Sequence, residues 1–135
     1  MLEAFVMLSG RLGRLAYFGY SLALGLVMAV LAAILILPMY HSPNAGGVLV
    51  VVLVLLGVLG FWGGLALTVK RLHDLNLSGW HYVWIGVLPA VLNGIARATQ
   101  SLPVGVAALV LTLIFGLFLM FWPGTDGSNN YGYRP

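Results

Sequence analysis

Long runs of apolar residues, interrupted by a few short polar segments, dominate this sequence. The 55 residues 15–69, between Arg14 and Lys70, contain no Asp, Glu, Lys or Arg. Two shorter uncharged runs follow, one on each side of Arg97. About 20 apolar residues, each rising 1.5 Å along a helix, cross the roughly 30 Å hydrocarbon core of a bilayer. The pattern therefore predicts membrane-spanning helices, and the first run is long enough for two of them.

An all-α integral membrane protein, a compact bundle of four transmembrane helices, is the predicted fold. The spans cover about residues 16–37, 48–69, 81–96 and 102–122. Pro, Asn and paired Gly residues at 38–47 predict the turn between the first two spans. A polar tail occupies 123–135, and no linker or low-complexity stretch divides the chain. We therefore expect residues 1–135 to form a single membrane domain.

The third segment, 81–96, has the weakest signal of the four. It contains Gly86, Pro89 and Gly94, and its 16 residues reach only about 24 Å as a helix. Such a segment either crosses the bilayer as a short kinked helix or enters and leaves on the same side. The distribution of Tyr and Trp favours four spans, because their rings prefer the membrane interface.

Composition strengthens the membrane interpretation and removes several classes of function. Hydrophobic residues make up 61% of the chain and charged residues only 7%, against about 25% in typical soluble proteins. This composition excludes a water-soluble globule and a nucleic-acid partner bound by a broad basic surface. The absence of cysteine excludes disulfides and thiolate metal sites. With only three acidic residues and no metal-ligand spacing of His, we expect no metal, no cofactor and no catalytic residues.

The positions of Lys and Arg predict the orientation of the chain in the membrane. With four spans, five of the six lie on the side of the N-terminus and only Arg97 lies on the other. A re-entrant third segment exchanges the sides of Arg97 and Arg134 and leaves the same excess. Since cytoplasmic loops are rich in Lys and Arg, the N-terminus is predicted to be cytoplasmic. The side of the C-terminus stays open.

Small residues indicate where the spanning helices pack, because helices in lipid approach closely through Gly and Ala. The predicted contact positions are Gly25, Ala29 and Ala33 on the first span and Gly57, Gly60 and Gly64 on the second. Packing within one bundle is the simpler interpretation. A face for association with a second copy is the alternative, since GxxxG spacing is common in apolar helices.

The polar residues gather in three segments, GRLGRLAYF (10–18), KRLHDLNLSGW (70–80) and PGTDGSNNYGYRP (123–135). Four spans place all three on the cytoplasmic side, where they could form one polar cap. Asp74 needs a partner there, because an isolated carboxylate near hydrocarbon is costly, and an Arg fork fits it well. The residues predicted to form this cap or an anion site are Arg11, Arg14, Lys70, Arg71, His73, Asp74, Trp80 and Asn129.

These three segments resemble the bacterial membrane proteins of domain-of-unknown-function family 805. The family pattern has a Gly-Arg…Arg…Tyr-aromatic start, an Arg-Leu-His-Asp…Ser-Gly-Trp loop and a Pro-Gly…Gly…Asn…Gly…Pro ending, in this order. The chain departs from it at Lys70, Phe18 and Asn130, where Arg, Trp and a basic residue are common. The resemblance implies a location in the bacterial inner membrane and a fold, but no activity.

Three functions are compatible with the sequence. A non-enzymatic membrane module that contacts lipid headgroups or other membrane proteins through the cap fits best. A small oligomeric transporter or channel for a neutral or anionic solute is the alternative, although no predicted span contains the carboxylate that proton coupling normally uses. A lipid-modifying enzyme fits least, because three scattered acids are too few to hold divalent metal ions.

Overall fold

The computed structural model describes residues 3–40 and 46–133. Regular structure in these residues is helical, apart from an isolated antiparallel bridge between Asn129 and Gly132 in the tail. The elements are α1 (Glu3–Val6), α2 (Arg14–Tyr40), α3 (Gly46–Asp74), a 3₁₀ turn η1 (Gly79–His81), a π-helix η2 (Val83–Val87), α4 (Leu88–Thr99) and α5 (Leu102–Phe121). Residues 41–45 of the predicted turn and 134–135 of the predicted tail lie outside the described residues.

Within the described residues, three helices are long and apolar enough to cross a membrane. The stretches are Arg14–Leu37, Gly46–Asp74 and Leu102–Phe121, with mean hydropathies of 2.6, 2.7 and 2.7. They coincide with the first, second and fourth predicted spans. The prediction of an all-α protein with long apolar helices at these places is confirmed.

The third predicted segment, 81–96, is not one of these three. From Gly79 to Thr99 the chain forms three short elements, η1, η2 and α4, instead of one helix. The prediction of a short kinked span is therefore not confirmed. Pro89 gives a physical reason for the π-helix, because proline has no N–H and its ring clashes with the carbonyl four residues earlier. At the end of η2 the N–H of Leu88 donates to the carbonyl of Val83, five residues back.

α3 ends in a Schellman motif, which turns the chain directly after Asp74. Asn76 has the left-handed conformation, with φ of 59°. The N–H of Leu77 donates to the carbonyl of Leu72, and the N–H of Asn76 donates to that of His73. These two bonds satisfy carbonyls that a helix end leaves without partners. The motif holds Asp74 at the very end of the helix.

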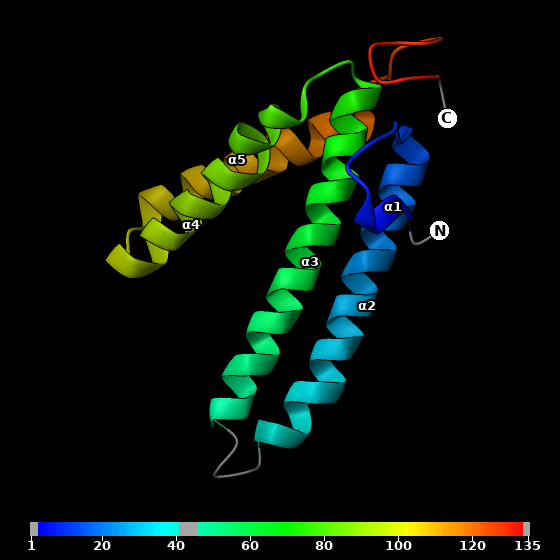
Figure 1. Ribbon diagram of the computed structural model, residues 1–135. Helices are drawn as coiled ribbons and strands as arrows, with labels where there is room; N and C mark the ends of the chain where they lie inside the picture. The colour runs from blue at the N-terminus through cyan, green and yellow to red at the C-terminus, as the bar shows by residue number, and fades with distance from the viewer. Residues whose placement is uncertain (1–2, 41–45, 134–135) are drawn as a thin grey trace.

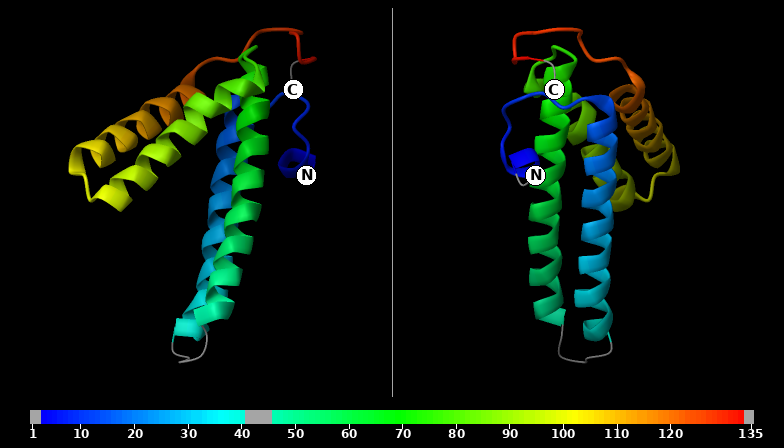
Figure 2. Two further views of the ribbon diagram at one scale, coloured as in Figure 1. Left: turned by 60° about the vertical axis from the view of Figure 1, so that its left-hand side comes forward. Right: turned by 90° about the vertical axis from the view of Figure 1, so that its right-hand side faces the viewer.

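Two antiparallel hairpins, α2/α3 and α4/α5, diverge from a common end (Figures 1 and 2). The polypeptide before α2, the turn after α3 and the tail after α5 meet at this end, and α1 lies against α3. Buried residues of α3 concentrate there, and the largest fully buried side chains are Leu67, Leu72 and Arg71. The core is therefore the junction of the two hairpins.

The contact between α2 and α3 uses only part of the predicted small-residue pattern. A Cβ atom on Gly60 would lie 3.7 Å from Met28, and one on Gly63 would lie 3.1 Å from Leu24. Five other positions were predicted. An added Cβ atom on Gly25, Gly57 or Gly64 would have nothing within 4 Å, and Ala29 and Ala33 are exposed. The contact face of α2 includes Leu24 and Met28 and lies about 100° around the helix from Gly25 and Ala29, so packing at these five positions stays a prediction.

Candidate functional site

Asp74 is the centre of a buried cluster that joins the three polar segments. We call residues 10–14, 70–76 and 123–133 the polar cap. The Oδ1 atom of Asp74 accepts hydrogen bonds from Arg11 Nε at 3.2 Å and Nη2 at 2.9 Å. Its Oδ2 atom accepts one from Arg71 Nη1, one helical turn earlier in α3. One carboxylate thus neutralises part of the charge of two arginines.

Arg11 also ties the tail to the rest of the cap. Its Nη1 donates to the carbonyls of Gly127 at 2.6 Å and Gly132 at 3.2 Å. Its Nη2 donates to the carbonyl of Thr125 at 2.7 Å and to the Oγ1 atom of the same residue at 3.1 Å. Gly127 and Gly132 have positive φ values of 75° and 119°. Such a backbone favours glycine, so these glycines allow the tail to turn its carbonyls toward Arg11.

Arg71 performs the corresponding function at the end of α5. Its side chain is fully buried, and Nε donates to the carbonyl of Leu119 at 2.7 Å while Nη2 donates to that of Trp122. The last carbonyls of a helix have no partners within the helix. The guanidinium supplies these partners and brings a positive charge to the negative end of the helix dipole. Arg71 therefore connects α3 to α5.

The tail packs onto the end of α3 through Thr125 and Gly124. The N–H and Oγ1 of Thr125 both donate to the backbone carbonyl of Asp74 at 2.9 Å. A Cβ atom on Gly124 would lie 2.1 Å from Asp74 Oδ2. No side chain larger than a hydrogen atom fits there unless the carboxylate moves. Gly124 is therefore required by close approach.

His73, next to Asp74 at the same helix end, makes a separate set of contacts. Its Nδ1 atom lies 3.2 Å from the carbonyl oxygen of Gly10, which can only accept a hydrogen bond. Its ring stacks on Tyr131 with centroids 4.0 Å apart and an interplanar angle of 4°. Nδ2 of Asn129 donates to the His73 carbonyl at 2.8 Å. His73 thus joins the N-terminal segment to the tail and makes no hydrogen bond with Asp74 among those of the described residues.

The polar groups inside this cluster are satisfied. In the described residues no buried side-chain nitrogen or oxygen lacks a hydrogen-bond partner. This matters because a buried charge without a partner costs several kcal/mol, roughly 3–5 when one member of a pair is removed. The described residues also contain no group of three or more metal-ligating side chains. The buried part of the cap is a closed structural network.

The structure distributes the eight predicted cap residues between three environments. Those within the network or buried beside it are Arg11, Lys70, Arg71, His73, Asp74 and Asn129. The backbone carbonyl of Lys70, itself buried, accepts a hydrogen bond from Leu12 N at 3.1 Å. Trp80 lies on η1 outside the cap, with 79% of its surface exposed. Arg14, the eighth, is exposed at the edge of the cap.

Sequence reasoning misses several residues of the network. Thr125, Gly124 and Tyr131 stand out in the sequence only as part of a turn-rich tail, and Gly10 only as part of a motif. Their function depends on atoms far apart in the sequence, such as Arg11 and the Thr125 carbonyl, which are 114 positions apart. Only one feature of the sequence indicates that these four residues belong to the network: they occur in the same three motifs as the charged residues.

An open cavity of about 470 Å³ lies at the edge of the cap. One wall is the beginning of α2, residues 13–16, and the other is the segment 123–126 with Asp74 behind it. Arg14 is one of the residues that line the cavity. Its guanidinium makes no hydrogen bond or ion pair with the described residues. Arg14 thus lies outside the hydrogen-bonded network of the described residues.

All three polar segments lie at one end of the molecule (Figure 1). The tail contacts both Arg11 and Asp74, so it lies at the same end of the molecule as the residues before α2.

The sequence pattern of the family described as "Protein of unknown function (DUF805)" matches residues 5–133. The match covers nearly the whole chain, and the chain belongs to this family, as the three motifs predicted. No curated protein and no solved structure matches the chain.

Proposed function

We propose that this DUF805 protein is a non-enzymatic, multi-pass protein of the bacterial inner membrane that binds lipid headgroups at the edge of its polar cap, on the cytoplasmic side. Its apolar helices support the membrane location. The excess of Lys and Arg on the side of the N-terminus supports the orientation.

The observation that carries the proposal is the difference between Arg14 and the other cations of the cap. Arg11 and Arg71 are buried and paired with Asp74, and Lys70 is 6% exposed and has contacts of its own. Arg14 is exposed, makes no ion pair with the described residues and lines a cavity. An arginine is suited to phosphate, because its planar fork can donate two parallel hydrogen bonds.

The height of this cavity in the membrane supports lipid as the ligand. Arg14 begins the first spanning helix, and Trp122 directly follows the last. Residues at the ends of spans lie at the level of the headgroups, where Trp is also favoured. A headgroup phosphate would therefore be at the depth of the Arg14 side chain.

The test compares Arg14→Gln with Arg97→Gln in the purified full-length protein. Both remove one exposed arginine, but Arg97 lies at the far end of α4. We expect Arg14→Gln to lower the amount of co-purified phospholipid, measured by native mass spectrometry, at least threefold, whereas Arg97→Gln leaves it unchanged. Equal retention by both variants would contradict the proposal.

A second experiment tests the orientation. A reporter that is active only in the cytoplasm, fused after Pro135, is expected to be active, since the tail and Arg11 are in contact. An inactive reporter, with the fusion correctly inserted, would show that the cap faces the other side.

A further inference from the structure

The residues that line the cap cavity carry both signs of charge. Arg14 belongs to the wall formed by the beginning of α2, and Asp126 belongs to the wall formed by the tail. Both residues are exposed. A ligand that fills the cavity would therefore meet a guanidinium on one side and a carboxylate on the other.

The two carboxylates that line the cavity differ in what they can accept. Both oxygens of Asp74 already accept hydrogen bonds from buried arginines, and its side chain is 5% exposed. Asp126 is exposed to solvent, and an ionised carboxylate has about four acceptor positions, so it can take a further donor beside the contacts that it has. Asp126 is the carboxylate that a ligand would reach.

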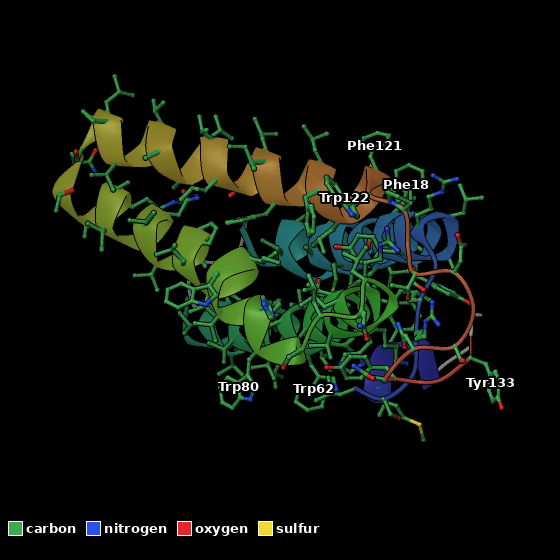
Figure 3. All side chains as sticks on the ribbon, turned by 90° about the horizontal axis from the view of Figure 1, so that it is seen from above. Phe18, Trp62, Trp80, Phe121, Trp122 and Tyr133 are labelled. Atoms are coloured by element: carbon green, nitrogen blue, oxygen red, sulfur yellow. The ribbon has the colours of Figure 1, made fainter. Side chains whose placement is uncertain are left out.

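Exposed apolar side chains lie on and near the cavity lining, and one of them, Leu15, is part of the lining. Leu15, Phe18 and Trp122 are 81%, 45% and 58% exposed. Figures 2 and 3 show the beginning of α2, which carries Phe18, beside the end of α5, which Trp122 follows. Two acyl chains could lie along this seam while a headgroup occupies the cavity. At about 470 Å³ the cavity is within the usual 300–1,000 Å³ of small-molecule sites.

We propose that the cavity selects a phospholipid with a primary amine in a zwitterionic headgroup, such as phosphatidylethanolamine. This inference rests on the proposed function and specifies its ligand. The phosphate pairs with Arg14 and the ammonium pairs with Asp126. A primary ammonium donates up to three hydrogen bonds, whereas the quaternary ammonium of choline donates none and a glycerol headgroup carries no positive charge. A headgroup without an amine pairs its phosphate with Arg14 but brings no positive charge to the Asp126 carboxylate.

The test measures binding of three short-chain lipids with identical acyl chains to the full-length protein in detergent. Dihexanoyl phosphatidylethanolamine, phosphatidylcholine and phosphatidylglycerol are compared by isothermal titration calorimetry, together with soluble phosphoethanolamine. We expect the ethanolamine lipid to bind at least fivefold more tightly than the other two lipids and than the soluble headgroup. Asp126→Asn should reduce the preference over phosphatidylcholine to less than twofold while binding persists.

Arg14→Gln should weaken the binding of all three lipids, and Arg97→Gln, the matched control, should leave it unchanged. Unfolding temperatures within 2 °C, a roughly sub-kcal/mol criterion, would show that the variants are folded. If Arg14→Gln weakens binding but the ethanolamine lipid is not preferred, the choice of ligand is wrong and headgroup binding stands. If Arg14→Gln has no effect, both fail. Equal affinity for soluble phosphoethanolamine would overturn the assignment to a lipid.

Discussion

The polar cap and the far ends of the two hairpins differ in how their side chains are covered. In the cap, the side chains of Arg11, Arg71 and Asp74 are almost completely buried and fully hydrogen-bonded. At the far ends, Val48 and Leu102 are 54% and 78% exposed. The most polar part of this protein is therefore its best-packed part, and the apolar part is the more open.

The physical reason is the solvent. In water, apolar side chains gain most from burial, but in lipid they gain little, because acyl chains are as apolar as leucine. A buried ion pair has the opposite property, since its members cannot be separated at low dielectric without a large penalty. The junction of the two hairpins therefore depends on its ion pairs more than their far ends do.

The largest expected effect comes from Asp74→Asn. This change leaves Arg11 and Arg71 buried without a counter-charge, so the free energy of unfolding in detergent should fall by about 3–5 kcal/mol. Chemical denaturation, monitored by tryptophan fluorescence, measures this loss of free energy of unfolding. Asp126→Asn, at an exposed acid of the same cap, is the control and should cost less than about 1 kcal/mol. Similar losses in both variants would mean that the ion cluster does not hold the cap.

Gly124→Ala should have the next largest effect. The added Cβ would lie 2.1 Å from Oδ2 of Asp74, whose carboxylate two arginines hold in place, and overpacking of this kind typically costs about 1–3 kcal/mol. Gly116→Ala, in α5, meets no atom within 4 Å and serves as the control. The same denaturation experiment compares them. A Gly124→Ala variant as stable as its control would show that the tail can move away from Asp74.

Tyr131→Ala tests the ring stack on His73. Aromatic pairs contribute about 0.5–1.5 kcal/mol beyond area burial, so a loss of roughly this size is expected. Tyr133→Ala is the matched control, because that ring is 88% exposed. Limited proteolysis of the tail should also become faster in Tyr131→Ala alone. Unchanged proteolysis would indicate that Arg11 holds the tail without the stack.

The smallest effect is expected in the α2/α3 hairpin, where two neighbouring glycines differ. Gly63→Ala brings a Cβ to 3.1 Å from Leu24, whose flexible end can move, and should cost less than about 1 kcal/mol. Gly64→Ala meets nothing within 4 Å and should be neutral. Unfolding curves of the two variants give the comparison. A larger loss in Gly64→Ala would reveal a contact with a second copy of the chain.

The sequence predicted much of the fold and part of the site. The first, second and fourth helical segments were found because an apolar run of sufficient length is a local property. The third was harder, because Pro89 and the glycines around it make the local signal ambiguous, and tertiary context produces a π-helix there. The face of α2 that contacts α3 includes Leu24 and Met28 and was not found from the sequence, because in a spanning helix the face that contacts protein is as apolar as the face that contacts acyl chains.

Hydropathy and charge can be counted along the chain, so the sequence was sufficient to predict long apolar helices, typical of a membrane protein, and to place seven of the nine charged residues in three motifs. The partners of Asp74, in contrast, became known only from the folded chain. Arg11 and Asp74 are 63 positions apart, and Arg11 and the Gly127 carbonyl are 116 apart. Arg11 and Arg14 are three residues apart and chemically identical, yet one is buried and the other exposed. Their difference depends on where α2 begins and where the tail returns, and both are properties of the tertiary structure.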